Sequence, residues 1–217
     1  MNASLNEIES LCKKAARGAG LSWGLAEEAG RAARWLSGNG LDGPALLAAQ
    51  LRLDDGRAYS QLAPDIGSEC WERVGSSMCP LICGVALSDY GYLIRENGRI
   101  LLGKVTCPQL LLPFVSATAT QLGIALQLSW RGCILEFSPG AEGVLIQADT
   151  FASTHVEGVS CVCIKAASET GQALSGSIAP LATGVHDYLD SLAARTYVPA
   201  SQASRLSGAG AGLSDNL

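Results

Sequence analysis

The sequence predicts an α+β protein: an N-terminal helical unit packed on a mostly antiparallel sheet, with a C-terminal helix and an extended arm. Three observations predict this class. Apolar residues follow helical spacing up to residue 53, short apolar runs joined by turn residues follow from residue 81, and a last helical pattern precedes the end. Helical patterns thus gather at the ends of the chain, whereas a doubly wound parallel fold alternates helices with strands.

The first part of the chain predicts three helices. Ser4 and Glu7 form a capping box, and glycines end the helix that follows. Ser22 can cap a second helix, and Asp42 precedes a third that begins with a proline. Residues 54–78 look irregular, which is typical of a segment that wraps the surface or forms a lid.

The middle of the chain predicts strands and two hairpins. Residues 81–87 form an apolar run of strand length, and Asn97–Gly98 between the runs 90–95 and 99–106 is a strong hairpin signal. The remaining predicted elements are a helix over 114–122, a hairpin of 124–130 with 133–137, strands over 144–148 and 159–166, and a helix over 181–195.

These elements predict three parts of the chain: an N-terminal helical unit at 1–53, an α+β sheet domain at 54–195 and a C-terminal glycine-rich arm at 196–217. A chain of 217 residues fits one large domain with a small appendage.

Composition excludes several classes of partner. Hydrophobic residues make up 48% of the chain and charged residues only 16%, so we expect much buried surface, which can include the interface of a homo-oligomer. The net charge is −5 and no stretch is basic enough to bind a phosphate backbone, which argues against nucleic acid. The start has no signal-peptide pattern and the apolar runs are too short to span a membrane, so a cytoplasmic location is predicted.

The eight cysteines are expected to be reduced, and most of them to be small buried hydrophobic side chains. Cys79 and Cys83 lie four residues apart, but a closed zinc site needs four ligands, usually in two close pairs. Cys161 and Cys163 lie in a predicted strand, so a second pair in a loop is missing and we expect no metal. No dinucleotide or phosphate-loop fingerprint is present, which leaves any cofactor unknown.

Three side chains are candidates for catalysis. Cys79 lies where a loop enters the predicted strand 81–87, a place where a thiol can be partly exposed and have a lowered pKa. His155 lies in a polar loop and His186 begins the last helix, and histidine is the usual acid–base group near neutral pH. The alternatives are an inert thiol and exposed histidines without a role.

The C-terminal arm carries a dense set of groups that can bind an anion. Arginine makes bidentate contacts with carboxylates and phosphates, and free N–H groups of glycines can cradle an anion. The predicted ligand-binding residues are Arg195, Tyr197, Ser204, Arg205, Gly208, Gly210 and Gly212. Two alternatives remain open, a frayed terminus and a tail that docks on a neighbouring subunit.

Motifs at both ends of the chain carry a resemblance. The segments 4–9, 14–20, 23–29 and 34–36, together with 195–199, 204–205 and 208–212, resemble a proteobacterial family described only as a domain of unknown function. That resemblance implies no activity, fold or cofactor, so no catalytic residue is carried over.

A second resemblance concerns residues 15–50. Their two alanine-rich helices resemble the N-terminal helices of the malate/L-lactate dehydrogenase family, which implies NAD. The histidine-bearing segment expected after those helices is missing, since the only histidines are His155 and His186, and this departure argues against NAD chemistry.

The sequence favours a cytoplasmic protein that handles a small anionic metabolite, either as a metabolic enzyme or as the accessory subunit of one. The alternative is a non-catalytic oligomeric interaction protein whose C-terminal arm docks on a partner. The residues leave open whether the protein is an enzyme at all. A polar pocket beside an arm folded into its own subunit would favour the first hypothesis.

Overall fold

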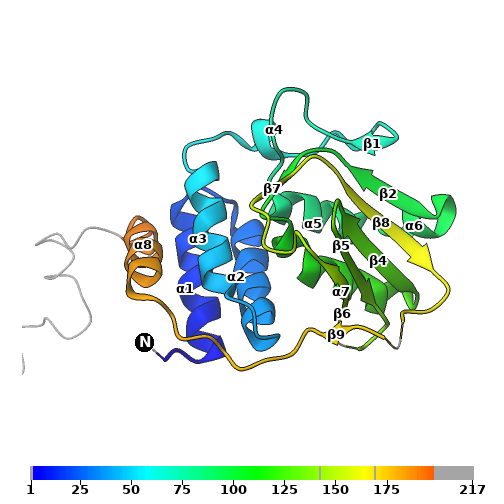
Figure 1. Ribbon diagram of the computed structural model, residues 1–217. Coiled ribbons are helices and arrows are strands. Elements are labelled where there is room, and N and C mark those ends of the chain that lie inside the picture. Colours follow the sequence, from blue (N-terminus) through cyan, green and yellow to red (C-terminus); the bar gives the residue numbers. More distant parts are fainter. Residues whose placement is uncertain (1, 142, 169, 198–217) are drawn as a thin grey trace, which may run out of the picture.

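The computed structural model of this protein describes residues 2–141, 143–168 and 170–197. Its elements form a group of helices on one side, a sheet on the other, and shorter helices between them (Figure 1). The predicted α+β class with a mostly antiparallel sheet is confirmed. The outer helices are α1 (Leu5–Gly18), α2 (Trp23–Gly38), α3 (Gly43–Asp54) and α8 (Thr183–Ala194).

The three N-terminal helices begin at the predicted caps. Ser4 Oγ accepts from the Glu7 N–H at 3.3 Å while Glu7 Oε2 accepts from the Ser4 N–H at 2.8 Å, so the capping box is confirmed. Ser22 and Asp42 accept from backbone N–H groups at the starts of α2 and α3. Burial of alanine and leucine along their facing sides joins these helices into one layer.

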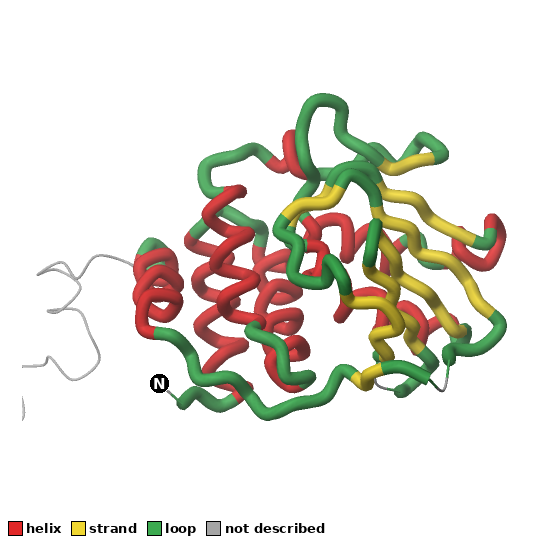
Figure 2. The backbone as a smooth tube through the Cα atoms, viewed as in Figure 1, coloured by secondary structure: helices red, strands yellow, loops and turns green. Residues whose placement is uncertain are grey.

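The helix α8 returns to this layer from the far edge of the sheet. The loop 174–182 runs along one side of the molecule and brings α8 onto α1 and α3 (Figure 2). Leu189, Leu192 and Ala193 form the buried side of α8.

The main sheet has seven strands in the order β1-β2-β8-β4-β5-β6-β9. Its strands are β1 (Cys70–Trp71), β2 (Arg99–Leu102), β4 (Ala125–Trp130), β5 (Cys133–Phe137), β6 (Val144–Ala148), β8 (Val159–Ile164) and β9 (Gln172–Ala173). Within this sheet, as the described residues form it, β1 and β2 pair in parallel and the other neighbouring strands pair antiparallel. The predicted hairpin of β4 and β5 is confirmed, and Gly132 in its turn has a φ of +76°.

Two predicted strands are helices. The apolar run 81–87 belongs to α5 (Pro80–Asp89), and 90–95 belongs mostly to α6 (Tyr92–Asn97). The predicted hairpin at Asn97–Gly98 is therefore wrong: Gly98 has the expected positive φ, +77°, but uses it to end α6. The third predicted run, 99–106, splits into β2 and a short strand, β3 (Val105–Thr106).

The remaining elements are short or lie between the layers. They are α4 (Tyr59–Leu62), the 3₁₀ helix η1 (Pro108–Leu111), α7 (Leu112–Leu122) and β7 (His155–Val156), which pairs with β3 in a separate two-stranded sheet. The predicted helix over 114–122 corresponds to α7, which Gly123 ends. It packs on β4 and β5, whereas α5 packs on α7 and α2.

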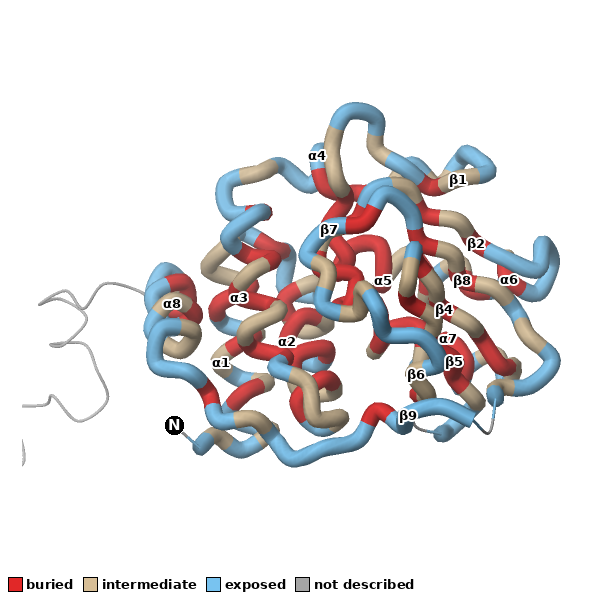
Figure 3. The backbone as a smooth tube through the Cα atoms, in the orientation of Figure 1, coloured by how far each residue is buried: buried red, intermediate tan, exposed pale blue. Residues whose placement is uncertain are grey.

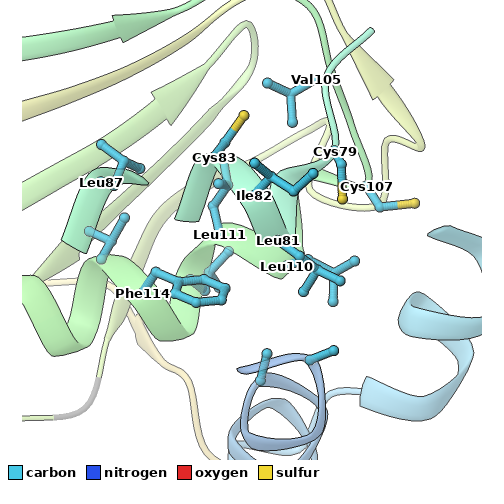
Figure 4. Packing of buried hydrophobic residues seen from close by; sticks show 14 of the residues in the cluster. Cys79, Leu81, Ile82, Cys83, Leu87, Val105, Cys107, Leu110, Leu111 and Phe114 are labelled. Carbon is cyan, nitrogen blue, oxygen red and sulfur yellow. The ribbon is translucent and has the colours of Figure 1, made fainter. Parts of the chain in front are cut away.

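The core runs through all three layers. Buried residues line the facing sides of the outer helices, of α5 and α7, and of the central strands (Figure 3). Around α5 the packing leaves little space, because a Cβ on Gly84 would lie 2.2 Å from the ring of Phe114 (Figure 4). One hydrophobic cluster contains residues from both sides of residue 53, and the division into parts at 53 and 195 stays a prediction.

All eight cysteines are free thiols, and only Cys163 is exposed. Across the described residues, no helix has the length and apolar character that crossing a bilayer demands.

Candidate functional site

An open depression of about 430 Å³ lies between the segment that precedes α5 and the two-stranded sheet of β3 and β7. Charged and hydroxyl side chains dominate its lining: Glu72, Arg73, Ser76, Ser77, Lys104 and His155. A concave place with convergent polar groups, one of them a histidine, is the kind of feature that binding and catalytic sites share.

Backbone pairing brings these residues together from three parts of the chain. Met78 forms a bridge with Val105 of β3, and Thr106 of β3 pairs with His155 of β7. The segment before α5, β3 and β7 therefore lie side by side. Ser77 meets His155 across 78 positions of sequence as a result.

His155 lies between a hydroxyl and a carboxylate. Its Nδ1 is 3.3 Å from Ser77 Oγ, and its Nε2 is 3.1 Å from Glu157 Oε1. Because a carboxylate only accepts, Nε2 carries the proton of the second hydrogen bond. In the neutral imidazole Nδ1 is then an acceptor, so it can take a proton from Ser77 or from a ligand bound beside it.

Lys104 fixes the carboxylate end of this chain of contacts. Its Nζ lies 3.2 Å from Glu157 Oε2. The hydrogen bond from His155, together with the Lys104 ammonium, lowers the pKa of the Glu157 carboxyl. Glu157 therefore stays ionised through neutral pH and keeps the imidazole in one orientation.

Arg73 adds a second cation to the wall. Its Nε donates to the Ala63 carbonyl at 2.9 Å, which holds the guanidinium in place. None of the acidic side chains in the described part of the chain forms an ion pair with it. Its charge is thus available to an anionic group that enters the depression.

The backbone around Ser77 does not favour an acyl-enzyme. Serine nucleophiles rely on amides that hold the developing oxyanion, often including the amide of the next residue. Here the N–H of that residue, Met78, donates to the Lys104 carbonyl at 2.8 Å. The Ser76 N–H donates to the Arg73 carbonyl at 3.3 Å. The arrangement fits proton transfer by His155 better than covalent catalysis by Ser77.

Cys79 is not the partly exposed thiol that the sequence predicted. It is fully buried at the start of α5, the helix that replaces the predicted strand. Burial first, and the nearby Asp54 carboxyl second, raise the pKa of the Cys79 thiol well above its usual value. A buried thiol that keeps its proton is a poor nucleophile, so Cys79 lacks the exposure that a catalytic thiol needs.

His186 lies apart from the depression. It is on α8, where its Nδ1 is 3.4 Å from Asp187 Oδ1, and it does not line the depression around His155.

The predicted anion site in the arm is described only at its start. Arg195 binds Asp55 through both guanidinium Nη atoms, at 2.8 and 3.0 Å. Tyr197 is exposed, with the Lys14 ammonium 5.9 Å from its ring centre. The other predicted ligand residues lie outside the described residues, so this site stays a prediction: Ser204, Arg205, Gly208, Gly210 and Gly212.

Sequence reasoning did not single out Ser77, Glu157 or Lys104. Glu157 lies two positions after His155, which is a usable local signal, but Ser77 and Lys104 carry none. For a metal the residues offer little: within 2–141, 143–168 and 170–197, no group of three His, Cys, Asp or Glu side chains is placed to hold one.

A comparison with known families finds a match over the N-terminal third of the chain. Residues 3–70 match the family described as Protein of unknown function (DUF3726), which confirms the predicted resemblance for the N-terminal motifs. No curated protein matches the sequence. Among solved structures, the crystal structure of dehydrogenase from Sinorhizobium meliloti is similar with 12% sequence identity and a TM-score of 0.49, over 90% of this chain and 68% of that chain.

Proposed function

We propose that this protein is a cytoplasmic metabolic enzyme, or an accessory subunit of one, that binds a small anionic metabolite in the depression around His155. In this proposal Lys104 and Arg73 hold the anionic group. His155 exchanges a proton with the bound molecule or through Ser77, and Glu157 orients the imidazole. The observation that carries the proposal is the chain of contacts from Ser77 through His155 to Glu157 in a concave, cation-bearing place.

The charges of the lining favour an anion over a cation. Lys104 shares its charge with Glu157, but Arg73 has no acidic partner among the described residues. Glu72 lies on the same wall and disfavours a ligand with negative charge spread over its whole surface. A compact anion with one charged end, such as a small carboxylate or a phosphate monoester, meets these conditions best.

The test combines a binding screen with two histidine variants. The melting temperature of the full chain is measured with small mono- and dicarboxylates, phosphate monoesters and inorganic phosphate. A ligand present at 100 times its dissociation constant adds about 2.7 kcal/mol of stability, which a thermal scan detects. The chain has two histidines, so NMR of the imidazole nitrogens reports on each site separately.

We expect a stabilising probe to shift the resonances of His155 and to leave those of His186 unchanged. His155→Gln and Lys104→Gln should each weaken the response, while the matched control His186→Gln retains it. Catalysis is then tested by incubating the stabilising probe with the protein. We expect the native protein to convert the probe and His155→Gln to lack this turnover. If none of these probes raises the melting temperature, or if His155→Gln responds as the native protein does, the proposal is wrong.

A further inference from the structure

A buried carboxyl, that of Asp54, lies at the end of α3. Asp54 is only 4% exposed and is the last residue of its helix, where the helix dipole disfavours a negative charge. Burial raises the pKa of the Asp54 carboxyl, against the opposing effects of Cys79, Gln50 and Arg57. Neither the helix nor the core gains from an acid at this position, which is a common mark of a functional group.

Buried hydrogen bonds satisfy one side of the carboxyl. The Gln50 amide donates through Nε2 to Asp54 Oδ2 at 2.9 Å, and the Thr106 hydroxyl donates to Gln50 Oε1 at 2.8 Å. Oδ1 of Asp54 has no hydrogen-bond partner of normal geometry among the described residues. The Cys79 thiol interacts with the same carboxyl but is a weak donor, so Asp54 keeps capacity for a stronger one.

Asp54 lines a cavity of about 370 Å³ that lies between the outer helices and α5. Its walls are mostly aliphatic, with Leu25, Leu51, Leu62 and Ile82 among them. Figure 4 labels Ile82 of α5 and Cys79, the residue before that helix, among the buried side chains. A neighbouring depression of about 380 Å³ shares Leu25 and Ile82, so the two recesses adjoin each other.

The lining of this cavity carries a positively charged side chain as well as the carboxyl. Arg57 lines it as well, three positions after Asp54 and close enough for its charge to act on the carboxyl. The guanidinium makes one long hydrogen bond, 3.3 Å from Nη2 to the Gln61 carbonyl, and has no acidic partner among the described residues. Ser22, the N-cap of α2, lies on the same lining, and the first turn of α2 has no acidic residue.

We propose that this cavity binds an apolar α-amino acid: the ammonium group on Asp54, the carboxylate on Arg57 and the side chain against the leucine and isoleucine walls. An ammonium supplies the strong donor that Asp54 lacks, and a carboxylate takes both N–H groups of an arginine fork. The carboxyl torsion of aspartate is broad, so Asp54 can turn toward the ligand while Gln50 follows its other oxygen. Contact with the aliphatic walls removes the surface of an apolar side chain from water, which stabilises the complex.

Simpler ligands match the lining less well. An alkylamine leaves Arg57 without a partner, and a fatty carboxylate leaves Asp54 without a donor and places two carboxyls near each other. These ligands therefore serve as the comparison arms of the test. The cavity is separate from the depression around His155, and the proposal does not depend on the function proposed there.

The experiment measures binding to the full chain by calorimetry, with leucine, isoamylamine and 4-methylvalerate as probes. These molecules share a branched alkyl body and differ in their charged groups. We expect leucine to bind most tightly, isoamylamine about tenfold more weakly and 4-methylvalerate weakest. Asp54→Asn can keep the hydrogen bond from Gln50 and should weaken leucine binding tenfold or more, since a charged hydrogen bond is lost.

Matched controls separate charge from folding. Asp187→Asn and Arg31→Gln change exposed residues of α8 and α2 and should leave leucine binding intact, while Arg57→Gln should bring the affinity for leucine down to that for isoamylamine. His155→Gln should also retain leucine binding. If Asp54→Asn fails to fold, the order of the three probes on the native protein still decides. No binding of leucine, or equal binding of leucine and 4-methylvalerate, overturns the proposal.

Discussion

Gly18→Ala should detach α8 from the rest of the protein. Gly18 is the last residue of α1, and a Cβ there would lie 1.8 Å from the Leu192 carbonyl oxygen and 2.6 Å from its carbon. Both atoms are backbone, so no side chain can turn away. Since non-bonded atoms sit about 3.5 Å apart, the two helices must separate by roughly 1.5–2 Å or lose contact.

The cost follows from what α8 buries. Leu189 and Leu192 are fully buried on its inner side. Exposing each costs about 1.5–3 kcal/mol, so detachment costs roughly 3–6 kcal/mol as an upper estimate. Alanine has a higher helix propensity than glycine, and this difference offsets up to about 1 kcal/mol of the lost stability. The ion pair of Arg195 with Asp55 is exposed to solvent, so it contributes little to the attachment of α8. The expected net loss is about 2–5 kcal/mol.

Urea denaturation of the variant measures this loss, and limited proteolysis reports whether the buried side of α8, with Leu189 and Leu192, becomes accessible. Gly184→Ala and Gly24→Ala are matched controls in α8 and α2, because an added Cβ at either position meets nothing within 4 Å. Both should be neutral or slightly stabilising. A Gly18→Ala protein as stable as Gly184→Ala would refute the reasoning, because it would mean that α8 does not rest on α1 as closely as described.

Three further predictions concern the turn at Gly98, the thiols and the buried carboxyl. Gly98→Val should lower stability by about 1–2 kcal/mol in thermal unfolding, because a β-branched residue resists the φ of +77°; an unchanged melting temperature would contradict this. Thiol titration without reductant should count eight thiols after denaturation, and in the native state Cys163 should react first; recovery of four or fewer thiols would mean that disulfides exist. Burial raises the pKa of Asp54 above its unfolded value, so its contribution to stability is present at low pH and declines as pH rises from about 4 through the folded pKa. Asp54→Asn should remove that decline. Parallel pH–stability curves for the variant and the native protein would show that Asp54 does not cause it.

Elements with their own end signals were predictable from the sequence. The capping box at Ser4, the glycine after α7 and the tight turn at Gly132 each act locally, and the corresponding elements form where predicted. The segment 81–87 was not predictable in this way. Most of helix α5 is buried, so its segment 81–87 is apolar throughout and shows no helical period. A short apolar run of this kind fits a strand or a helix equally well.

The turn at Gly98 shows a related limit. Asn–Gly favours a positive φ, and that preference is met in the structure. A positive φ serves a hairpin and a helix C-terminus alike, and the choice depends on the preceding residues. Here Tyr92–Asn97 forms a helix that packs against β2 and β8, so tertiary contacts decided the outcome.

Local sequence signals cover only part of each candidate site, because each site also uses segments far apart in sequence. Thr106 shows how one residue serves both. Its backbone pairs with His155 and so places the imidazole at the depression, while its hydroxyl donates to Gln50, which holds the Asp54 carboxyl. A two-residue strand gains little from its own two pairs of residues, so the side-chain hydrogen bond to the helical layer helps to fix it. The same buried contacts that anchor β3 therefore determine the geometry of the histidine and the orientation of the aspartate.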